Sequence, residues 1–230
     1  MMTKNIDFDI CKRCGIKSMA AKMLDDNELE QLSNSCAEVE FKKGDNIIKQ
    51  GALSSNVIYV KSGLVKFHLY GPIKEQIIRI DRAPIFIGLP ISFNDKINYY
   101  SATALEQTRV CFIDIRIFKH FVHQNGDFAF QIIVDLSKNE HSSMNKCINR
   151  TQKNINGRIA DALLHFHELY NKKEFILPLS RQELGNYTDT SRENVSRILT
   201  QLHQDKIIRV SNKKIKIVNE EMLTLISKNG

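Results

Sequence analysis

The sequence predicts an α+β protein with an antiparallel β-roll of the jelly-roll type, a long helix and a carboxy-terminal winged helix-turn-helix. Three observations support this assignment. Short β-type segments fill residues 38–114, an uninterrupted helical pattern starts at Asp127, and two short amphipathic helices joined by a tight turn fit Leu179–Ile208. We therefore expect the roll within residues 1–126, the long helix over 127–154 and the winged helix-turn-helix over 155–230.

The roll is predicted from six short segments rich in β-branched and aromatic residues. Gly44, Gly51, Gly63 and Gly71 mark the bends between them. Strands this short and evenly spaced are typical of an antiparallel barrel or roll, and we expect a helix at Asp25–Cys36 to precede them. The predicted strands are Glu38–Phe41, Asn46–Lys49, Val57–Val60, Leu64–Tyr70, Glu75–Ile80 and Arg109–Ile113.

The long helix is predicted from a stripe of residues about three to four positions apart, with no Gly or Pro before Gly157. Polar residues at 139–142 interrupt this stripe. Such a helix could pair with its copy in a second chain or could pack on its own domain, and the pattern leaves both possibilities open. The stripe comprises Phe128, Ile132, Leu136, Ser143, Cys147 and Thr151.

Two helices and a turn are predicted within Leu179–Ile208. Ser180 and Glu183 have the spacing of a capping box for the first helix, and Thr190 and Glu193 have it for the second. Asp189 lies in the turn between them, where its side chain tolerates a left-handed backbone better than most. A strand pair around Ile207–Val210 and Lys214–Val218 should form the wing. Val195, Ile198, Leu199 and Leu202 form the expected buried stripe of the second helix.

The opposite face of the second helix is polar in its first two turns, the part of a recognition helix that reaches base edges in the major groove of double-stranded DNA. Arginine can donate two hydrogen bonds to guanine, and glutamate can accept one from cytosine. Taken singly, these residues could also be a helix cap and a solvated face. The DNA-binding candidates are Arg192, Glu193, Ser196 and Arg197, together with Ser180, Arg181 and Ser191.

Composition favours a polyanionic partner and argues against a membrane protein. The formal net charge is +7, and residues 150–230 hold 14 Lys and Arg against 9 Asp and Glu. Phosphate backbones attract such a surface regardless of base sequence. No apolar run approaches the length of a membrane span, and the amino terminus has no apolar signal-peptide core, so we expect a cytoplasmic protein.

Catalysis has no support in the sequence, which lacks phosphate-binding loops, nucleophile elbows, zincin motifs and dinucleotide fingerprints. The rival from another functional class is a cupin-like β-roll metalloenzyme or small-molecule-binding protein. Its metal site would need a set of His and Glu residues on adjacent strands. His68 is the only histidine in the strand region.

The segment SRQELGNYTDTSRENVSRIL resembles the helix-turn-helix of the Crp/Fnr family of bacterial transcription regulators. Gly157-Arg158-Ile159-Ala160 resembles the helix before it, and Phe41–Gly51 with Tyr59–Gly63 resembles the family's cyclic-nucleotide-binding roll. The resemblance implies that residues 127–154 are the dimerisation helix of a homodimer, which binds a palindromic promoter site and works with RNA polymerase. It places Arg192, Glu193 and Arg197 on base-contacting positions, in a pattern closer to the Fnr branch.

The family's cAMP-binding members carry Gly-Glu-Leu and Arg-Ser-Ala segments around the nucleotide phosphate. The matching stretches here are Gly88-Leu89-Pro90 and Tyr100-Ser101-Ala102, so the arginine and the glutamate are lost. Losing a buried charged contact costs on the order of a thousandfold in affinity, so we expect that cAMP does not bind. Gly88, Leu89, Tyr100 and Ser101 remain the candidates for a degenerate pocket, which apolar side chains could also fill.

Three cysteines match the Fnr branch, whose members hold an iron–sulfur cluster. Cys11 and Cys14 have Cys-x-x-Cys spacing, and Cys111 follows a segment like the one that holds the distal cluster cysteine. The position of the remaining ligand is occupied by Ala20, although a cluster normally takes four thiolates. An iron–sulfur cluster, a dithiol switch and unreactive thiols therefore all remain open. Cys36 and Cys147 are expected to be small core residues.

Overall fold

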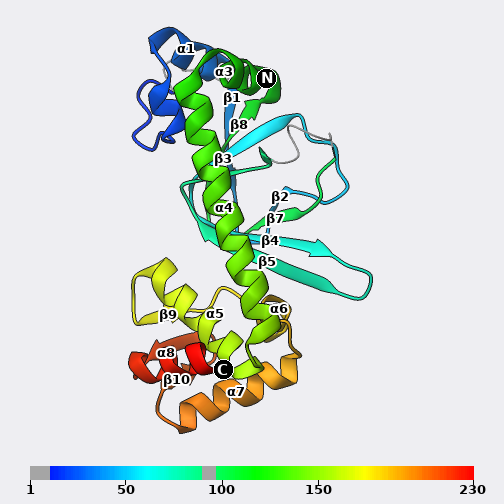
Figure 1. Cartoon of the computed structure of the whole chain (residues 1–230), viewed down its shortest axis with the longest axis vertical. Coiled ribbons are helices and arrows are strands. Elements are labelled where there is room, and N and C mark those ends of the chain that lie inside the picture. The colour runs from blue at the N-terminus through cyan, green and yellow to red at the C-terminus, as the bar shows by residue number, and fades with distance from the viewer. Residues whose placement is uncertain (1–10, 90–96) are drawn as a thin grey trace. The chain divides into compact units, whose positions relative to one another are not determined.

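The computed structural model describes residues 11–89 and 97–230 and divides them into two compact units (Figure 1). The first comprises the described residues within Met1–Phe67 and Ile80–Glu140, and the second comprises His68–Arg79 and His141–Gly230. This division passes through the long helix. The domain boundaries expected at residues 126 and 154 therefore stay predictions.

Two four-stranded sheets form the predicted β-roll. The strands are β1 (Cys36–Phe41), β2 (Asn46–Ile48), β3 (Asn56–Ser62), β4 (Leu64–Tyr70), β5 (Glu75–Arg82), β6 (Ile85–Ile87), β7 (Ser101–Ala104) and β8 (Thr108–Asp114). The sheet orders are β1-β8-β3-β6 and β2-β7-β4-β5. All six predicted strands are confirmed, with ends shifted by at most two residues. Sequence reasoning missed β6, which is too short to show alternation, and β7, which contains two alanines.

The first unit also contains a 3-10 helix η1 (Ala20–Met23) and the helices α1 (Asp26–Asn34) and α3 (Ile115–Gln124). Asp25 caps α1 in a capping box with Glu28, with hydrogen bonds of 2.8 and 2.9 Å. The prediction that this helix reaches Cys36 is wrong, because Cys36 begins β1. Apolar side chains from these helices and from β3 and β8 form one buried cluster, which includes Leu29, Leu32, Val57, Ile113, Phe118 and Phe121.

The long helix is confirmed as α4 (Gly126–Gln152). Only the first half of its stripe packs on the first unit: Phe128 and Ile132 are buried in the cluster, and Leu136 packs against it. Pairing of α4 with a second copy stays a prediction. Cys147 is exposed, so its assignment to a core is wrong. Ser143 and Thr151, which share its stripe, are exposed as well, because the buried cluster ends near Leu136. Among the described residues, no helix is long and apolar enough to cross a membrane.

The second unit contains the predicted winged helix-turn-helix. Its helices are α5 (Ile155–Tyr170), α6 (Arg181–Thr188), α7 (Arg192–Gln204) and α8 (Glu220–Asn229), and its strands are β9 (Glu174–Ile176), β10 (Ile208–Ser211) and β11 (Lys214–Ile217). The antiparallel pair β10–β11 confirms the wing, with Ile208 opposite Ile217. Sequence reasoning missed β9, whose three residues pair with β11 and complete the sheet.

Candidate nucleic-acid interface

The first helix of the motif, α6, begins as predicted. Ser180 Oγ accepts a hydrogen bond from the Glu183 amide at 3.1 Å, and Glu183 Oε2 accepts one from the Ser180 amide at 2.8 Å. This capping box satisfies two amides that the helix cannot satisfy itself. Leu184 is fully buried and anchors the helix in the second unit. Local sequence therefore determines where α6 starts.

The turn between α6 and α7 has the predicted left-handed residue at Asp189, with φ of 52° and ψ of 55°. The Thr190 amide donates to the Gly185 carbonyl at 2.9 Å and closes the turn. A Cβ atom at Gly185 would lie 2.7 Å from the Thr190 carbonyl oxygen, so this position has no room for a side chain. The close approach holds the two helices in one arrangement.

The start of α7 differs from the prediction by one residue. Ser191, not Thr190, is the N-cap, and its Oγ accepts from the Asn194 amide at 3.2 Å. Thr190 is only 9% exposed, and its Oγ1 accepts from Asn194 Nδ2 at 3.2 Å. The capping box expected from Thr190 and Glu193 is therefore wrong, because packing of Thr190 into the turn leaves the next hydroxyl to cap the helix.

The two faces of α7 separate as the helical period requires. Val195, Ile198, Leu199 and Leu202 are at most 4% exposed and confirm the predicted buried stripe. On the other face Arg192, Glu193, Ser196 and Arg197 are all exposed. Their exposure makes them available to a partner, whereas their contacts with bases remain predictions.

Glu193 and Ser196 make local bonds within this exposed face. The Glu193 carboxylate receives hydrogen bonds from its own amide and from Ser191, which lower its pKa and keep it ionised. Ser196 Oγ donates to the Arg192 carbonyl at 3.0 Å. The face therefore presents two guanidiniums and one carboxylate from the first two turns of the helix.

Two other predicted DNA contacts have structural roles. Ser180 belongs to the cap of α6. Arg181 is half-buried and donates from Nη2 to the Asn212 carbonyl at 3.0 Å, in the turn of the wing. Burial lowers the pKa of Arg181, although its guanidinium stays charged in water. This arginine therefore joins α6 to the wing, and its contact with DNA remains a prediction.

The wing carries exposed basic residues in different electrostatic settings. Lys214 Nζ lies 2.5 Å from Glu174 Oε1, and Lys216 Nζ lies 4.0 Å from Glu174 Oε2. The hydrogen bond from Lys214 lowers the pKa of Glu174, so this carboxylate is ionised at neutral pH. Lys213 lies at the exposed turn just before β11. Glu174 on β9 thus offsets part of the charge of the wing, a pairing that sequence reasoning missed.

The predicted nucleotide-pocket residues do not form a phosphate site. The Gly88 amide donates to the Tyr100 hydroxyl at 2.9 Å, so the tyrosine engages an amide that a phosphate would need. Leu89 is 1% exposed, and Ser101 Oγ accepts from the Gln50 amide at 3.0 Å. Pro90 lies outside the described residues. None of the four candidates supplies a positive charge, so they do not fit an anionic cyclic nucleotide.

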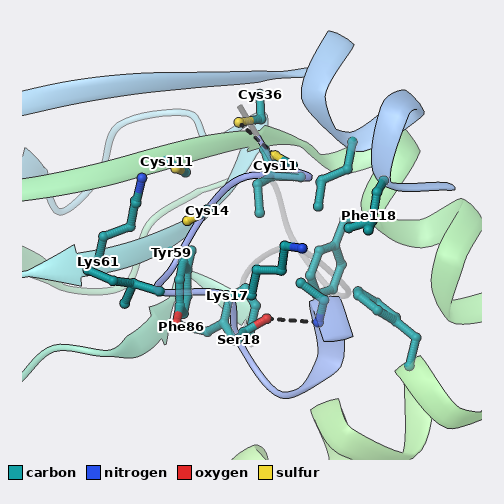
Figure 2. Close-up of a pocket in the computed structure, with 16 residues that line it drawn as sticks. Cys11, Cys14, Lys17, Ser18, Cys36, Tyr59, Lys61, Phe86, Cys111 and Phe118 are labelled. Carbon is teal, nitrogen blue, oxygen red and sulfur yellow. Dashed lines mark hydrogen bonds between the residues drawn. The ribbon is translucent and has the colours of Figure 1, made fainter. Parts of the chain in front are cut away.

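Four of the five cysteines lie together in the first unit. Cys11, Cys14, Cys36 and Cys111 line one pocket in the first unit (Figure 2). Over residues 11–89 and 97–230, no group of three or more His, Cys, Asp or Glu residues could hold a metal ion. Ala20, at the position of the missing family ligand, is fully buried and offers no donor. Four thiols nevertheless line this pocket, and an iron–sulfur cluster held by them stays a prediction.

Cys36 is a functional candidate that sequence reasoning assigned to the core. Its Sγ lies 3.9 Å from Cys11 Sγ, across a separation of 25 residues. Alternation in β1 places Cys36 on the same face as Glu38, which is paired with Cys111 on β8. Only this register, which depends on pairing of distant strands, could have revealed the proximity.

Comparison with known proteins gives the same architecture. Residues 157–226 match the Crp-like helix-turn-helix domain, and residues 38–125 match the cyclic nucleotide-binding domain. The chain is 24% identical over 217 residues to the transcriptional activator protein FnrA of Stutzerimonas stutzeri, covering 91% of this chain and 88% of that protein. It is 27% identical over 193 residues to the transcriptional activator protein Anr of Pseudomonas protegens, covering 81% and 79%. The structure of FixK2 from Bradyrhizobium japonicum matches with a TM-score of 0.73 at 20% identity, over 83% of this chain and 96% of that one.

Proposed function

The chain is a DNA-binding transcription regulator of the Crp/Fnr family and not an enzyme, and we propose that it binds a palindromic promoter site as a homodimer. The observation behind this proposal is the exposed face of α7, where Arg192, Glu193 and Arg197 extend from the first two turns. These turns are the part of a recognition helix that meets base edges.

We propose that α7 lies in the major groove and that its three charged side chains read bases. Arg192 and Arg197 can each donate two parallel hydrogen bonds to guanine O6 and N7, and Glu193 can accept from cytosine N4. The ionised state of Glu193 suits the role of acceptor. Lys213 and its basic neighbours in the wing would contact phosphates, which contribute affinity without base specificity.

The proposed dimer pairs α4 with its copy. Besides the stripe that packs on the first unit, α4 carries a second row of apolar residues, each 50% exposed or more: Phe130, Ile133, Met144 and Ile148. At about 3.6 residues per turn these positions fall on one face of the helix, opposite the buried stripe. An exposed apolar row of this kind is typical of a surface that a second protein covers. A second copy suits it, because a two-fold dimer matches a palindrome.

The signal that this regulator detects is proposed to act at the roll or at the cysteine pocket. The residues at the family's nucleotide site do not fit cAMP, as the Gly88–Tyr100 hydrogen bond illustrates. A bound signal would act by favouring one of two arrangements of the DNA-binding helices. The relatives named transcriptional activators support RNA polymerase as a further partner, and a DNA-binding role would place the protein in the cytoplasm.

Selection of bound duplexes from a random pool by the full-length protein tests the proposal. We expect enrichment of a two-fold symmetric sequence whose half-sites lie about 34 Å apart, one turn of DNA. Sedimentation of the protein alone should give the mass of a dimer. Retention of random duplexes without enrichment would contradict base reading, and enrichment of one isolated half-site would contradict the dimer.

A further inference from the structure

We propose that Arg158 is a positioning residue for DNA recognition, whose side chain joins the end of α4 to the turn between α6 and α7. This role rests on the proposed function, in which two copies of α7 read two half-sites, and it names a residue that sets the direction of α7. Arg158 lies on α5, outside the predicted DNA contacts. The basis is a set of four hydrogen bonds from one guanidinium.

The guanidinium of Arg158 contacts four backbone carbonyl oxygens. Its Nε donates to the Thr188 carbonyl at 2.8 Å, and its Nη2 donates to the Asp189 carbonyl at 3.2 Å. Its Nη1 donates to the Arg150 carbonyl at 3.1 Å and to the Lys153 carbonyl at 2.8 Å. Arginine carries its N–H donors in a rigid planar fork, so these bonds fix the two contacted segments relative to each other.

The four carbonyls belong to two helix ends of the second unit. Arg150 lies in the last turn of α4, and Lys153 follows that helix. Thr188 ends α6, and Asp189 is its C-cap. The last carbonyls of a helix have no partner within it, and they give that end a partial negative charge. A guanidinium that contacts two such ends supplies both the missing donors and an opposite charge. The end of α4 and the helix-turn-helix lie in the same compact unit, so this contact lies within one body.

The backbone of Arg158 is itself held in place. Asn154 caps α5: its Oδ1 accepts from the Gly157 amide at 3.1 Å, and its carbonyl accepts from the Arg158 amide at 3.0 Å. The next two residues, Ile159 and Ala160, are fully buried. Because burial fixes the base of the side chain, a shift of the turn relative to the end of α4 would break some of the four hydrogen bonds.

Lys74 and Gln76, at the start of β5, also contact the helix-turn-helix. Lys74 Nζ lies 3.1 Å from Asp189 Oδ1, with the two side chains 47% and 50% exposed. Ion pairs this exposed contribute little, because water and salt screen them. Gln76 donates to the Asn186 carbonyl, which lies within α6 and not in the turn. Each is a single contact, whereas the half-buried Arg158 bonds four carbonyls at two helix ends, so Arg158 is the positioning residue and Lys74 the matched control.

The position of the turn matters because α7 starts directly after it. Arg197 follows Arg192 by five residues, which is about 8 Å along the axis at about 1.5 Å per residue. A tilt of α7 by about 10° at the turn would move the base of the Arg197 side chain by about 1 Å, whereas recognition groups must be held within about 0.5 Å of their productive geometry. In a dimer, such tilts also change the separation of half-sites that both copies of α7 can reach. Arg158 should therefore restrict the half-site spacing that the dimer accepts.

Binding of the full-length protein to duplexes with altered half-site spacing tests this role. Fluorescence anisotropy compares the selected palindrome, the same half-sites with one base pair inserted or removed between them, and an isolated half-site. One base pair shifts a half-site by about 3.4 Å and turns it by about 35° around the duplex. Wild type should therefore lose about tenfold or more in affinity on each altered spacing, because one copy of α7 can no longer reach its bases.

Two variants of Arg158 probe the fork and the charge separately. Arg158→Lys keeps the charge but lacks the planar fork, and Arg158→Gln keeps two N–H donors without the charge. Both should lose about tenfold or more on the palindrome and bind the isolated half-site within about twofold of wild type. Their loss on the altered spacings should shrink to about threefold, because α7 is no longer held in one direction. Lys74→Ala should keep the wild-type spacing profile.

Three results would overturn the role of Arg158. One is an unchanged spacing profile in either Arg158 variant that still binds the half-site. Another is an equal loss on the half-site and the palindrome, which would place the defect within the recognition helix itself. The third is a Lys74→Ala profile as altered as that of the Arg158 variants. A wild type without a preferred spacing would refute the proposed dimer as well, so failure of this role alone is distinguishable from failure of the proposed function.

Discussion

Replacing Arg197 by alanine should remove sequence-specific binding while leaving the fold intact. Arg197 is exposed on the second turn of α7, beside the buried Ile198 and Leu199. Alanine is the strongest helix former, so an exposed Arg197→Ala change costs the helix almost nothing. What the variant loses is therefore a contact to a partner and not a contact within the protein.

The magnitude follows from the number of contacts. One bidentate arginine–guanine pair discriminates by about 1–3 kcal/mol, and a two-fold dimer makes that contact twice. The cognate palindrome should thus lose about 2–6 kcal/mol, which is a loss of affinity of about 30-fold or more. A random duplex loses only weak phosphate attraction, so its affinity should fall several-fold at most.

Fluorescence anisotropy with the selected palindrome and a scrambled duplex, at several salt concentrations, measures both losses. Arg197→Lys is the matched control, since lysine keeps the charge but lacks the planar fork. It should behave like the alanine variant on the palindrome and like wild type on the scrambled duplex. Equal losses of the alanine variant on both duplexes, or full recovery of cognate affinity by lysine, would refute base reading by Arg197.

Four further predictions concern the wing, the turn, the dimer and the cysteine pocket. Lys213→Ala should weaken binding to any duplex and flatten the dependence of affinity on salt by about one unit of slope per lost contact. Lys214→Ala should flatten this dependence less, since Lys214 is already paired with Glu174. Equal salt slopes for the two variants would contradict the effect of this ion pair. Gly185→Ala should lower the free energy of unfolding by about 1–3 kcal/mol in thermal or urea melts, because its Cβ meets a carbonyl oxygen at 2.7 Å; an unchanged melt would show that the turn can relax. Phe130→Glu should produce a monomer in sedimentation, whereas a persisting dimer would place the interface elsewhere. The rate of Cys11 alkylation should rise with pH around a midpoint near pH 6, because its neighbours lower the pKa of this thiol to about 6. The ionised thiol stabilises the fold above the ordinary thiol pKa, and this stabilisation is lost as pH falls through about 6. An alkylation midpoint at the ordinary thiol pKa would contradict this charge environment.

Features with local causes were predictable. Ser180 and Glu183 are three residues apart, and this spacing suffices to make the capping box that starts α6. Asp189 adopts the left-handed backbone expected of it. The exposed face of α7 was likewise predictable, because the positions of Val195 and Leu202 decide which side of the helix faces the core.

Features that depend on distant contacts were not predictable. Thr190 and Ser191 could both cap α7, and the packing of Thr190 against the turn decided in favour of Ser191. Glu174 could not be linked to Lys214 before β9 was seen to pair with β11. Two apolar rows run along α4, and only the packed cluster shows that Phe128 belongs to the covered one.

Cys11 and Cys36 illustrate the same division within the cysteine pocket. The spacing of Cys11 and Cys14 drew attention to the amino-terminal thiols, since spacing is visible in the chain. Cys36 joined them only through the fold, which brings β1 beside the amino-terminal segment across 25 residues. Residues close in sequence thus determine helix caps, the buried face of a helix and turn residues. Their spacing along the chain fixes which hydrogen bonds they can form and which way their side chains point. Partners across the fold are settled by strand pairing and packing, which depend on the whole chain at once.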